Sequence, residues 1–226
     1  MAWLRALAVI VAVAGALLLL ASGLGVRLGL WTYGTGFALL SYAAYTGVAA
    51  AALALAALFL PQGRARWIAA LLAALGIGAA TAYLPYSVQQ RARSAPRIND
   101  ITTDTEKPPQ FKQPLSYGGP QFAEQQRKAY PDIQPAVLAA GPEAAFARAL
   151  AAAQAMGWDI VDARPKEGRI EATASTFWFG FRDDVVVRIT PLPAGSRIDV
   201  RSRSRVGRGD TGTNAQRVRA YLKRLN

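Results

Sequence analysis

Cysteine and histidine are both absent from the 226 residues of this chain. Their absence excludes thiolate nucleophiles, zinc sites built from Cys and His, Ser-His-Asp triads and histidine-ligated haem. A chain without cysteine is stable in either redox environment, so the composition is compatible with an oxidising compartment without requiring one.

Acidic residues are absent from the first 99 positions, and all 14 lie at or after Asp100. Residues 1–99 carry only seven charges, all arginine, in a background of Ala, Leu, Val and Gly. This asymmetry predicts a membrane region followed by a soluble domain. The net charge of +12 divides into +7 for residues 1–99 and +5 for residues 100–226, where 19 Lys and Arg face 14 Asp and Glu. Because the soluble part is only modestly basic, nucleic acid is not an expected partner.

Three apolar runs predict a region of three membrane-spanning helices over residues 1–86. The first, Ala6–Leu24, would be about 28 Å long as a helix, roughly one hydrocarbon thickness. The runs Phe37–Leu60 and Trp67–Leu84 follow, and each is ended by a proline, Pro61 and Pro85. Rings with one polar edge prefer the headgroup region, so the aromatic residues at the ends of the runs are expected interface anchors: Trp31, Tyr33, Trp67, Tyr83 and Tyr86.

Two further features of this region carry expectations. Gly76 and Gly78 would allow neighbouring helices to approach closely. For the first run the alternative is a cleaved signal peptide, because Arg5 precedes it and Ala21-Ser22-Gly23 could lie near a cleavage site. The two apolar runs that follow favour a membrane span.

Orientation rests on the arginines beside the spans. Arg5, Arg64 and Arg66 share one side of the membrane, against Arg27 in the first loop, which favours an N-terminus inside the cell. Arginines within residues 91–97 oppose this assignment, but long domains translocate largely regardless of charge. We therefore expect an inner- or plasma-membrane protein whose C-terminal domain is external, in the periplasm if the cell is a Gram-negative bacterium.

Residues 87–130 are rich in Gln, Pro, Asp, Thr and Lys, and we expect an extended linker that covers the domain. Pro108 and Pro109 exclude a helix there, and the Asp and Thr residues before them favour turns. The alternative is an oxygen-ligand cluster for a cation formed by Asp100, Asp104 and Glu106, although these lack the spacing and glycine of a calcium loop.

Residues 131–226 are predicted to form an α+β domain, an antiparallel four-stranded sheet with flanking helices. Pro142 and Gly157 suit the start and the end of the first helix. The expected strands are 158–163, 169–179, 183–192 and 197–206, and the last helix is 213–225, with Arg217 on its outer face. In the last strand one face is apolar to small and the other is charged, with Arg197, Asp199, Arg201, Arg203 and Arg205.

Gly207–Gly212 has the spacing G-x-G-x-x-G between a strand and a helix. A dinucleotide is not expected, because the fingerprint belongs to a parallel βαβ unit with a later ribose-binding carboxylate. A phosphate or lipid headgroup at the helix N-terminus is the narrower hypothesis. The alternative is a turn capped by Asp210, Thr211 or Thr213. The candidates for anion or partner binding are Arg201, Arg203, Arg205, Gly207, Arg208, Gly209 and Gly212.

Two other clusters precede this loop. The aromatic residues Phe177, Trp178, Phe179 and Phe181 form either part of the core or a contact surface for a membrane or partner. Asp183 and Asp184 point to opposite faces of a strand, so we expect partners among Arg169, Arg182 and Arg188 rather than one shared reacting atom. We expect no metal and no cofactor, and the metal-binding alternative would use Asp100, Asp104, Asp183 and Asp184.

Several of these motifs together resemble the DUF1499 family over about residues 98–225, outside the three spans. The matching stretches are Asp-Ile-Thr-Thr-Asp at 100–104, Pro108-Pro109, Tyr-Pro-Asp-Ile at 130–133, Gly157-Trp158, Arg-Ile-Glu-Ala-Thr at 169–173, residues 176–184, residues 199–207 and Asn214-Ala215. The family has no known function, so the resemblance implies no reaction, cofactor or catalytic residue. Its members often carry an export signal or membrane segment, which supports an external domain.

Two hypotheses of function follow. The first is a membrane-anchored, non-enzymatic protein of the cell envelope that docks on a membrane-protein partner or an anionic headgroup. The second is a cation-dependent hydrolase that uses the aspartates named above.

Overall fold

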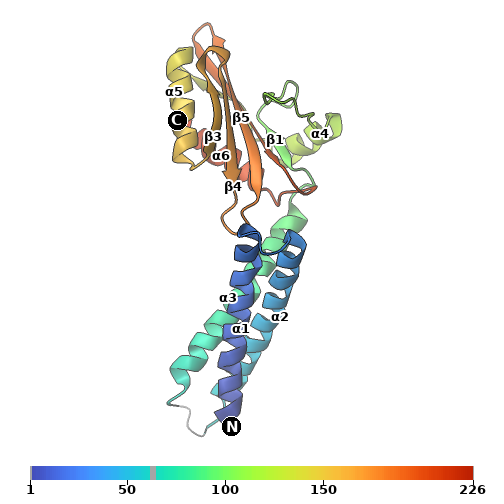
Figure 1. Ribbon diagram of the computed structural model, residues 1–226, viewed down its shortest axis with the longest axis vertical. Coiled ribbons are helices and arrows are strands. Elements are labelled where there is room, and N and C mark those ends of the chain that lie inside the picture. Colours follow the sequence, from blue (N-terminus) through green and yellow to red (C-terminus); the bar gives the residue numbers. More distant parts are fainter. Residues whose placement is uncertain (1, 62–64, 226) are drawn as a thin grey trace. The chain divides into compact units, whose positions relative to one another are not determined.

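The computed structural model describes residues 2–61 and 65–225 of the chain. It divides into two compact units. The helical unit contains the residues up to Gln90 and also Phe177–Gly180, and the sheet unit contains Arg91–Thr176 and the residues from Phe181 onward (Figure 1). The chain therefore passes between the units three times.

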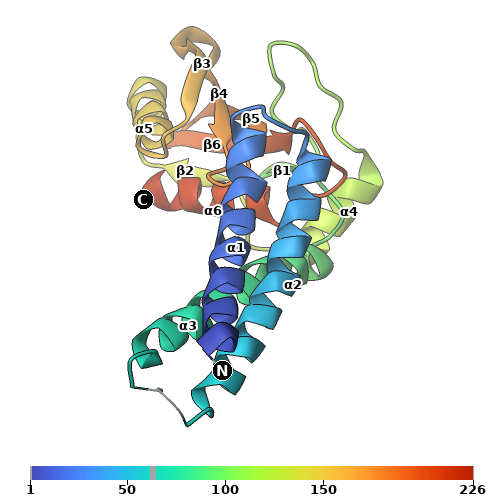
Figure 2. The ribbon, with the colours of Figure 1, turned by 60° about the horizontal axis from the view of Figure 1, so that its bottom comes forward.

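Three long helices make up the helical unit: α1 (Ala2–Arg27), α2 (Tyr33–Leu58) and α3 (Ile68–Ser94). Each is long and apolar enough to cross a membrane, which confirms the prediction of three candidate spans. Helices α1 and α2 lie side by side along their length (Figure 2). Their outward side chains are Leu, Val, Ile and aromatic residues, as expected for surfaces that face lipid.

The predicted end of the third helix at Leu84 is wrong. Pro85 lies inside α3, and the helix continues to Ser94. A proline removes one backbone N–H, but the rest of the hydrogen-bond ladder remains, and membrane helices tolerate such a residue. The first residues of the linker expected from residue 87 are therefore helical, as far as Ser94.

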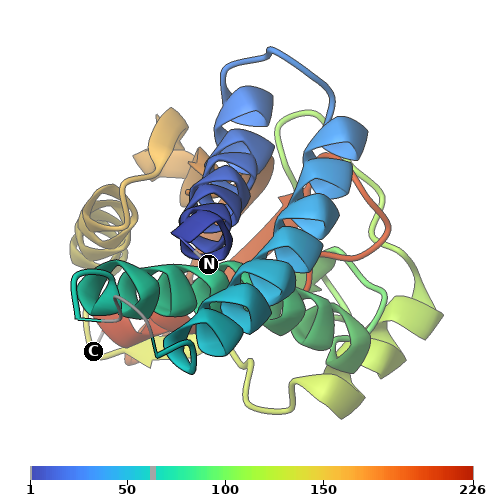
Figure 3. The same ribbon diagram turned by 90° about the horizontal axis from the view of Figure 1, so that it is seen from below.

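Helices α2 and α3 cross at a pair of facing glycines, Gly47 and Gly78 (Figure 3). A Cβ atom at Gly78 would lie 2.8 Å from the backbone nitrogen of Ala51 and from the carbonyl oxygen of Gly47. The expectation of a close approach is confirmed at Gly78. A Cβ at Gly76 would meet nothing within 4 Å, so the same expectation is wrong there.

The sheet unit is built on an antiparallel sheet in the order β1-β6-β5-β4-β3, with β2 also paired to β6. Four of its strands are the predicted ones: β3 (Asp159–Arg164), β4 (Arg169–Ser175), β5 (Arg182–Leu192) and β6 (Gly195–Ser204). The sheet has more strands than the four predicted, because the short strands β1 (Asp100–Thr102) and β2 (Ala136–Leu138) extend it. A 3₁₀ turn, η1 (Pro165–Glu167), joins β3 to β4.

Both faces of this sheet are covered (Figure 1). Helices α5 (Pro142–Ala155) and α6 (Thr213–Leu225) pack on one face, over an apolar core that includes Ile170, Val187 and Val200. The predicted helices 142–156 and 213–225 are thus confirmed. The other face carries the charged side chains of β5 and β6, and the segment from Asp100 through α4 (Pro120–Ala129) lies over it.

One prediction follows from the helix crossing. Gly78→Ala should lower the melting temperature of the detergent-solubilised protein, because overpacking typically costs about 1–3 kcal/mol. Gly76→Ala is the matched control on the same helix, where the added methyl group meets open space and alanine favours the helix over glycine by up to about 1 kcal/mol. Thermal unfolding followed by circular dichroism measures both, and equal melting temperatures for the two variants would contradict a backbone contact at Gly78.

Candidate functional site

A buried ion pair lies at the centre of the charged face. Arg201, on β6, has no exposed surface, and it donates to both carboxylate oxygens of Asp100 on β1, from Nε at 2.9 Å and from Nη2 at 2.8 Å. Two of its other N–H groups donate to the carbonyl oxygens of Pro109 at 3.2 Å and Leu115 at 3.0 Å.

Two aromatic rings complete the enclosure of this guanidinium. The centroids of Phe111 and Tyr117 lie 5.3 and 5.6 Å from its central carbon, within cation–π range. Burial, together with the charge of Asp100, raises the pKa of Tyr117 to about 12. The guanidinium of Arg201 is therefore surrounded by groups of the fold and is not accessible to a ligand.

A second network lies further along the same face, where two carboxylates share two guanidiniums. Arg188 donates to Asp104 and to Asp199 at 2.9 Å each, and Arg197 donates to the same two residues at 3.0 Å. Burial raises the pKa of the Asp104 carboxyl, but the backbone N–H of Lys107 and the guanidinium of Arg188 hold it, on balance, below its ordinary value. The ionised form of the Asp104 carboxyl is therefore favoured in the folded protein.

The motif at residues 100–104 attaches the covering segment to the sheet. Gln126, buried on α4, accepts from the N–H of Thr102 at 2.9 Å and donates to its carbonyl oxygen at 2.6 Å. The hydroxyl of Thr103 donates to Asp199 at 3.2 Å. These hydrogen bonds therefore hold α4 against β1 and the end of β1 against β6.

A third network lies under α6 on the opposite face. Arg217 was predicted to point outward, and this is wrong, because its guanidinium is buried and donates to Asp183 at 2.6 Å. It also donates to the hydroxyl of Ser202 at 2.9 Å and to the side chain of Asn214. The buried carboxylate gives this guanidinium a partner, so the arginine is stable on the inner face.

The glycine loop before α6 forms a turn, and its own carboxylate caps the helix. Asp210 accepts from the N–H of Gly212 at 3.0 Å and of Asn214 at 2.6 Å. Burial raises the pKa of Asp210, while these two N–H groups act against that rise. The N–H groups that would bind an external anion already have an acceptor in Asp210, one of the three capping residues considered from the sequence.

The four aspartates considered for a metal do not gather. Asp183 and Asp184 face opposite sides of the sheet, as predicted, but their partners are Arg217 and Arg205 rather than Arg169, Arg182 or Arg188. Asp100 and Asp104 belong to the networks above. Within residues 2–61 and 65–225, no three carboxylates lie close enough to hold a metal ion.

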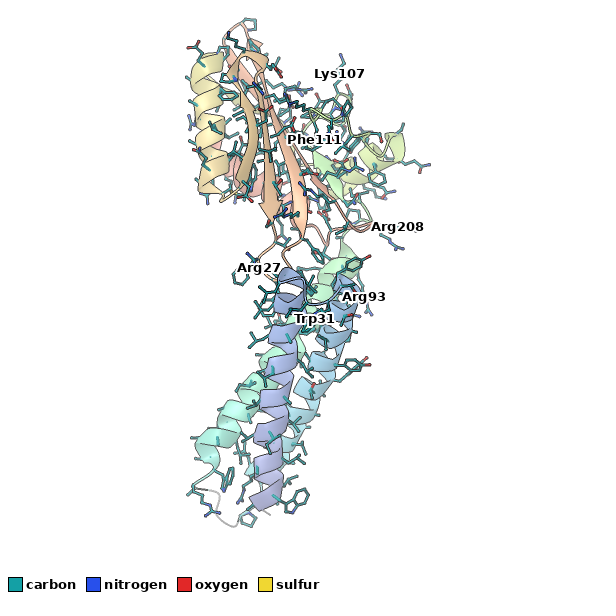
Figure 4. The ribbon with its side chains drawn as sticks, viewed as in Figure 1. Arg27, Trp31, Arg93, Lys107, Phe111 and Arg208 are labelled. Atoms are coloured by element: carbon teal, nitrogen blue, oxygen red, sulfur yellow. The ribbon has the colours of Figure 1, made fainter. Side chains whose placement is uncertain are left out.

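Several exposed arginines of the sheet unit have no acidic partner among the described residues, Arg127 and Arg224 included, and we call five of them the basic rim: Arg91, Arg93, Arg97, Arg182 and Arg208. Arg91 and Arg93 lie on the last turns of α3, and Figure 4 labels Arg93 and Arg208.

Contacts within the sheet unit bring together the segments that carry Arg97, Arg182 and Arg208. Gly209, next to Arg208, packs against the Cα of Arg97, where a Cβ would lie at 3.5 Å. The side chain of Asn99 donates to the carbonyl oxygen of Gly207 at 2.6 Å. Beside this loop, the N–H of Arg205 donates to the carbonyl oxygen of Arg182 at 3.3 Å.

Two other predicted arginines lie near this rim but are bound. Arg205 donates to Asp184 at 2.6 Å, and Arg203 donates to the carbonyl oxygen of Ser116 at 3.2 Å. Of the candidates from the sequence, Arg208 therefore keeps a guanidinium that has no partner in the described chain.

The aromatic cluster is divided between the two units. Trp178 donates to the hydroxyl of Ser22 at 3.3 Å, and the ring centroids of Phe179 and Phe37 are 5.1 Å apart. All four residues belong to the helical unit. A Cβ at Gly23 would lie 2.3 Å from Trp178, so this glycine leaves the space that the indole fills. Phe177 is 87% exposed, and Phe181 belongs to the sheet unit.

The fold defines a class: three candidate membrane helices indicate a membrane protein, and an α+β domain with an antiparallel sheet follows them. A family model described as "Protein of unknown function (DUF1499)" matches residues 100–225, more than half of the chain. The chain belongs to the DUF1499 family. No curated protein and no solved structure matches it.

Sequence reasoning missed the residues that cover the charged face. The sequence predicted no role for Gln126, Phe111 or Tyr117. The residues that they contact, Thr102 and Arg201, lie in strands that are distant from them in the sequence. Arginines at alternate positions of β6 were a usable signal, since a row of charges on one face needs either solvent or a complementary cover.

The buried ion pair yields a second prediction. Asp100→Asn should cost about 3–5 kcal/mol of unfolding free energy, because it leaves Arg201 charged and uncompensated in the interior. Asp184→Asn removes the same charge from a partly exposed pair and should cost less than about 1 kcal/mol. Denaturant unfolding of the full chain in detergent measures both, and similar losses would show that burial does not set the strength of the pair.

Proposed function

We propose that the protein is a non-enzymatic membrane protein of the cell envelope whose sheet unit binds anionic phospholipid headgroups through the basic rim. The observation that carries this proposal is that the rim collects five exposed arginines without acidic partners, whereas the charged face of β6 is bound and largely covered.

Chain connectivity supports a position at the membrane surface. Arg91 follows the interfacial Tyr86 by five residues of the same helix, which is about 8 Å at roughly 1.5 Å per residue. That distance is similar to the thickness of the headgroup layer. Arg182 lies two residues after Gly180, which belongs to the helical unit.

The chemistry of arginine favours phosphate as the ligand. A guanidinium presents paired N–H donors that match two phosphate oxygens, and it stays charged at every physiological pH. A basic residue close to an anionic membrane contributes about 1 kcal/mol, so five together give a clear preference for anionic over zwitterionic lipid.

A lipid titration tests the proposal. Phosphatidylglycerol added to the detergent-solubilised full chain should raise its melting temperature more than phosphatidylcholine does, because a ligand of the folded state stabilises it by mass action. Arg182→Glu combined with Arg208→Glu should abolish this difference. Lys166→Glu combined with Lys223→Glu is the matched control, since it makes the same charge change at exposed residues outside the rim and should keep the difference.

Two outcomes would refute headgroup binding. One is equal stabilisation of the wild type by both lipids, and the other is an unchanged preference in the Arg182/Arg208 double variant. Loss of a co-purifying protein from that variant, with its lipid preference intact, would assign the rim to a protein partner instead.

We also propose that the N-terminus lies inside the cell and that the sheet unit is external. The arginine count beside the spans supports this orientation. Alkaline phosphatase fused after Asn226 should be active, because it requires an external, oxidising compartment, and green fluorescent protein fused there by the same export route should be dark. The reverse pair of signals would place the sheet unit in the cytoplasm.

A further inference from the structure

A polar depression of about 600 Å³ lies in the sheet unit beside α4. No arginine of the basic rim lines it, so it is independent of the function proposed above. Its lining comes from the loop after β1, from the end of α4, from the segment before β2 and from β6: Thr103, Asp104, Thr105, Glu106, Lys107, Gln126, Arg127, Tyr130, Ile133, Gln134, Pro135 and Arg197.

The walls of this depression are held in place before any ligand arrives. Asp104 accepts from the backbone N–H of Glu106 at 3.1 Å and of Lys107 at 2.9 Å, which closes the loop into a turn. Gln126 is buried and ties the end of α4 to β1 through Thr102. A site that is already ordered loses little conformational entropy when it binds.

The charges around the depression leave a single positive excess. Asp104 and Asp199 are balanced by Arg188 and Arg197 in the network already described. Of the other lining residues, Lys107 and Arg127 are cationic and Glu106 is acidic.

The two cations keep donors for a ligand. Arg127 donates to the hydroxyl of Thr105 at 2.9 Å and has no acidic partner in the described chain. The ammonium group of Lys107 has no partner among the described residues either, and Lys107 projects from the surface (Figure 4). One anionic group of charge −1 would therefore neutralise the site.

We propose that this depression binds a sugar that carries a carboxylate, a uronate. Arg127 and Lys107 would hold the carboxylate, because a guanidinium pairs well with two carboxylate oxygens. Tyr130 and Pro135 are partly exposed in the lining and offer apolar surface to the C–H face of a sugar ring. The hydroxyl of Thr105 and the amide of Gln134 lie beside it for the sugar hydroxyls.

Isothermal titration of the full chain in detergent tests this site with glucuronate as the probe. Glucuronate should bind with a millimolar dissociation constant, and glucose and acetate should each bind at least about tenfold more weakly, because each lacks half of the recognised chemistry. Arg127→Gln should weaken glucuronate binding at least about fivefold. Lys128→Gln, at the next exposed position of α4 and outside the lining, should leave it unchanged.

Three results would overturn the proposal: no binding of glucuronate, equal binding of acetate and glucuronate, or equal losses in Arg127→Gln and Lys128→Gln. Arg127 is exposed, so its variant should keep the wild-type melting temperature, and this measurement separates a lost site from a lost fold. The Arg127 variant should keep the preference for phosphatidylglycerol, and the rim variant should keep glucuronate binding, so the two proposals fail separately.

Discussion

The sheet unit depends on the ion pair between Arg201 and Asp100, because it joins the last strand to the first across a buried face. Removing two charges from water is costly, and the cost is offset only when every donor and acceptor finds a partner. Two backbone carbonyls and two aromatic rings supply those partners here, and all four come from residues 109–117. The covering segment is therefore held by electrostatics and hydrogen bonds as well as by apolar contacts such as those of Phe122 with the core.

This constraint explains which features were predictable from the sequence. The alternation of β6, the opposite faces of Asp183 and Asp184 and the two flanking helices follow from local periodicity, and all were confirmed. The cover was not predictable, because β1 and β2 have three residues each and no period to detect. A charged face exposed to water and one covered by complementary charges have the same local pattern. Arg217 shows the same limit, since only the position of Asp183 makes its burial favourable.

The aromatic residues after β4 show how tertiary contacts end a strand. The sequence favours a strand through Phe179, but β4 stops at Ser175, and Phe177–Gly180 belongs to the helical unit. Trp178 fits where Gly23 has no side chain, about 150 residues earlier in the chain, so no local signal could separate a core role from a contact role. The outcome combines the two: Trp178 and Phe179 pack within the helical unit, whereas Phe177 is exposed.

The distribution of arginines separates the residues that hold the fold from those that remain for ligands. Arg188, Arg197, Arg201 and Arg217 each pair with at least one carboxylate that is buried or nearly so. Removing Arg201 or Arg217 would leave a buried carboxylate without its close partner, whereas Arg188 and Arg197 share Asp199. The five rim arginines and Arg127 satisfy no carboxylate in the described chain. An exposed, unpaired guanidinium contributes little to stability, and close spacing of like charges opposes folding slightly. The stability of the fold therefore does not explain why the rim arginines lie together, and this supports the proposal that they bind an anionic ligand.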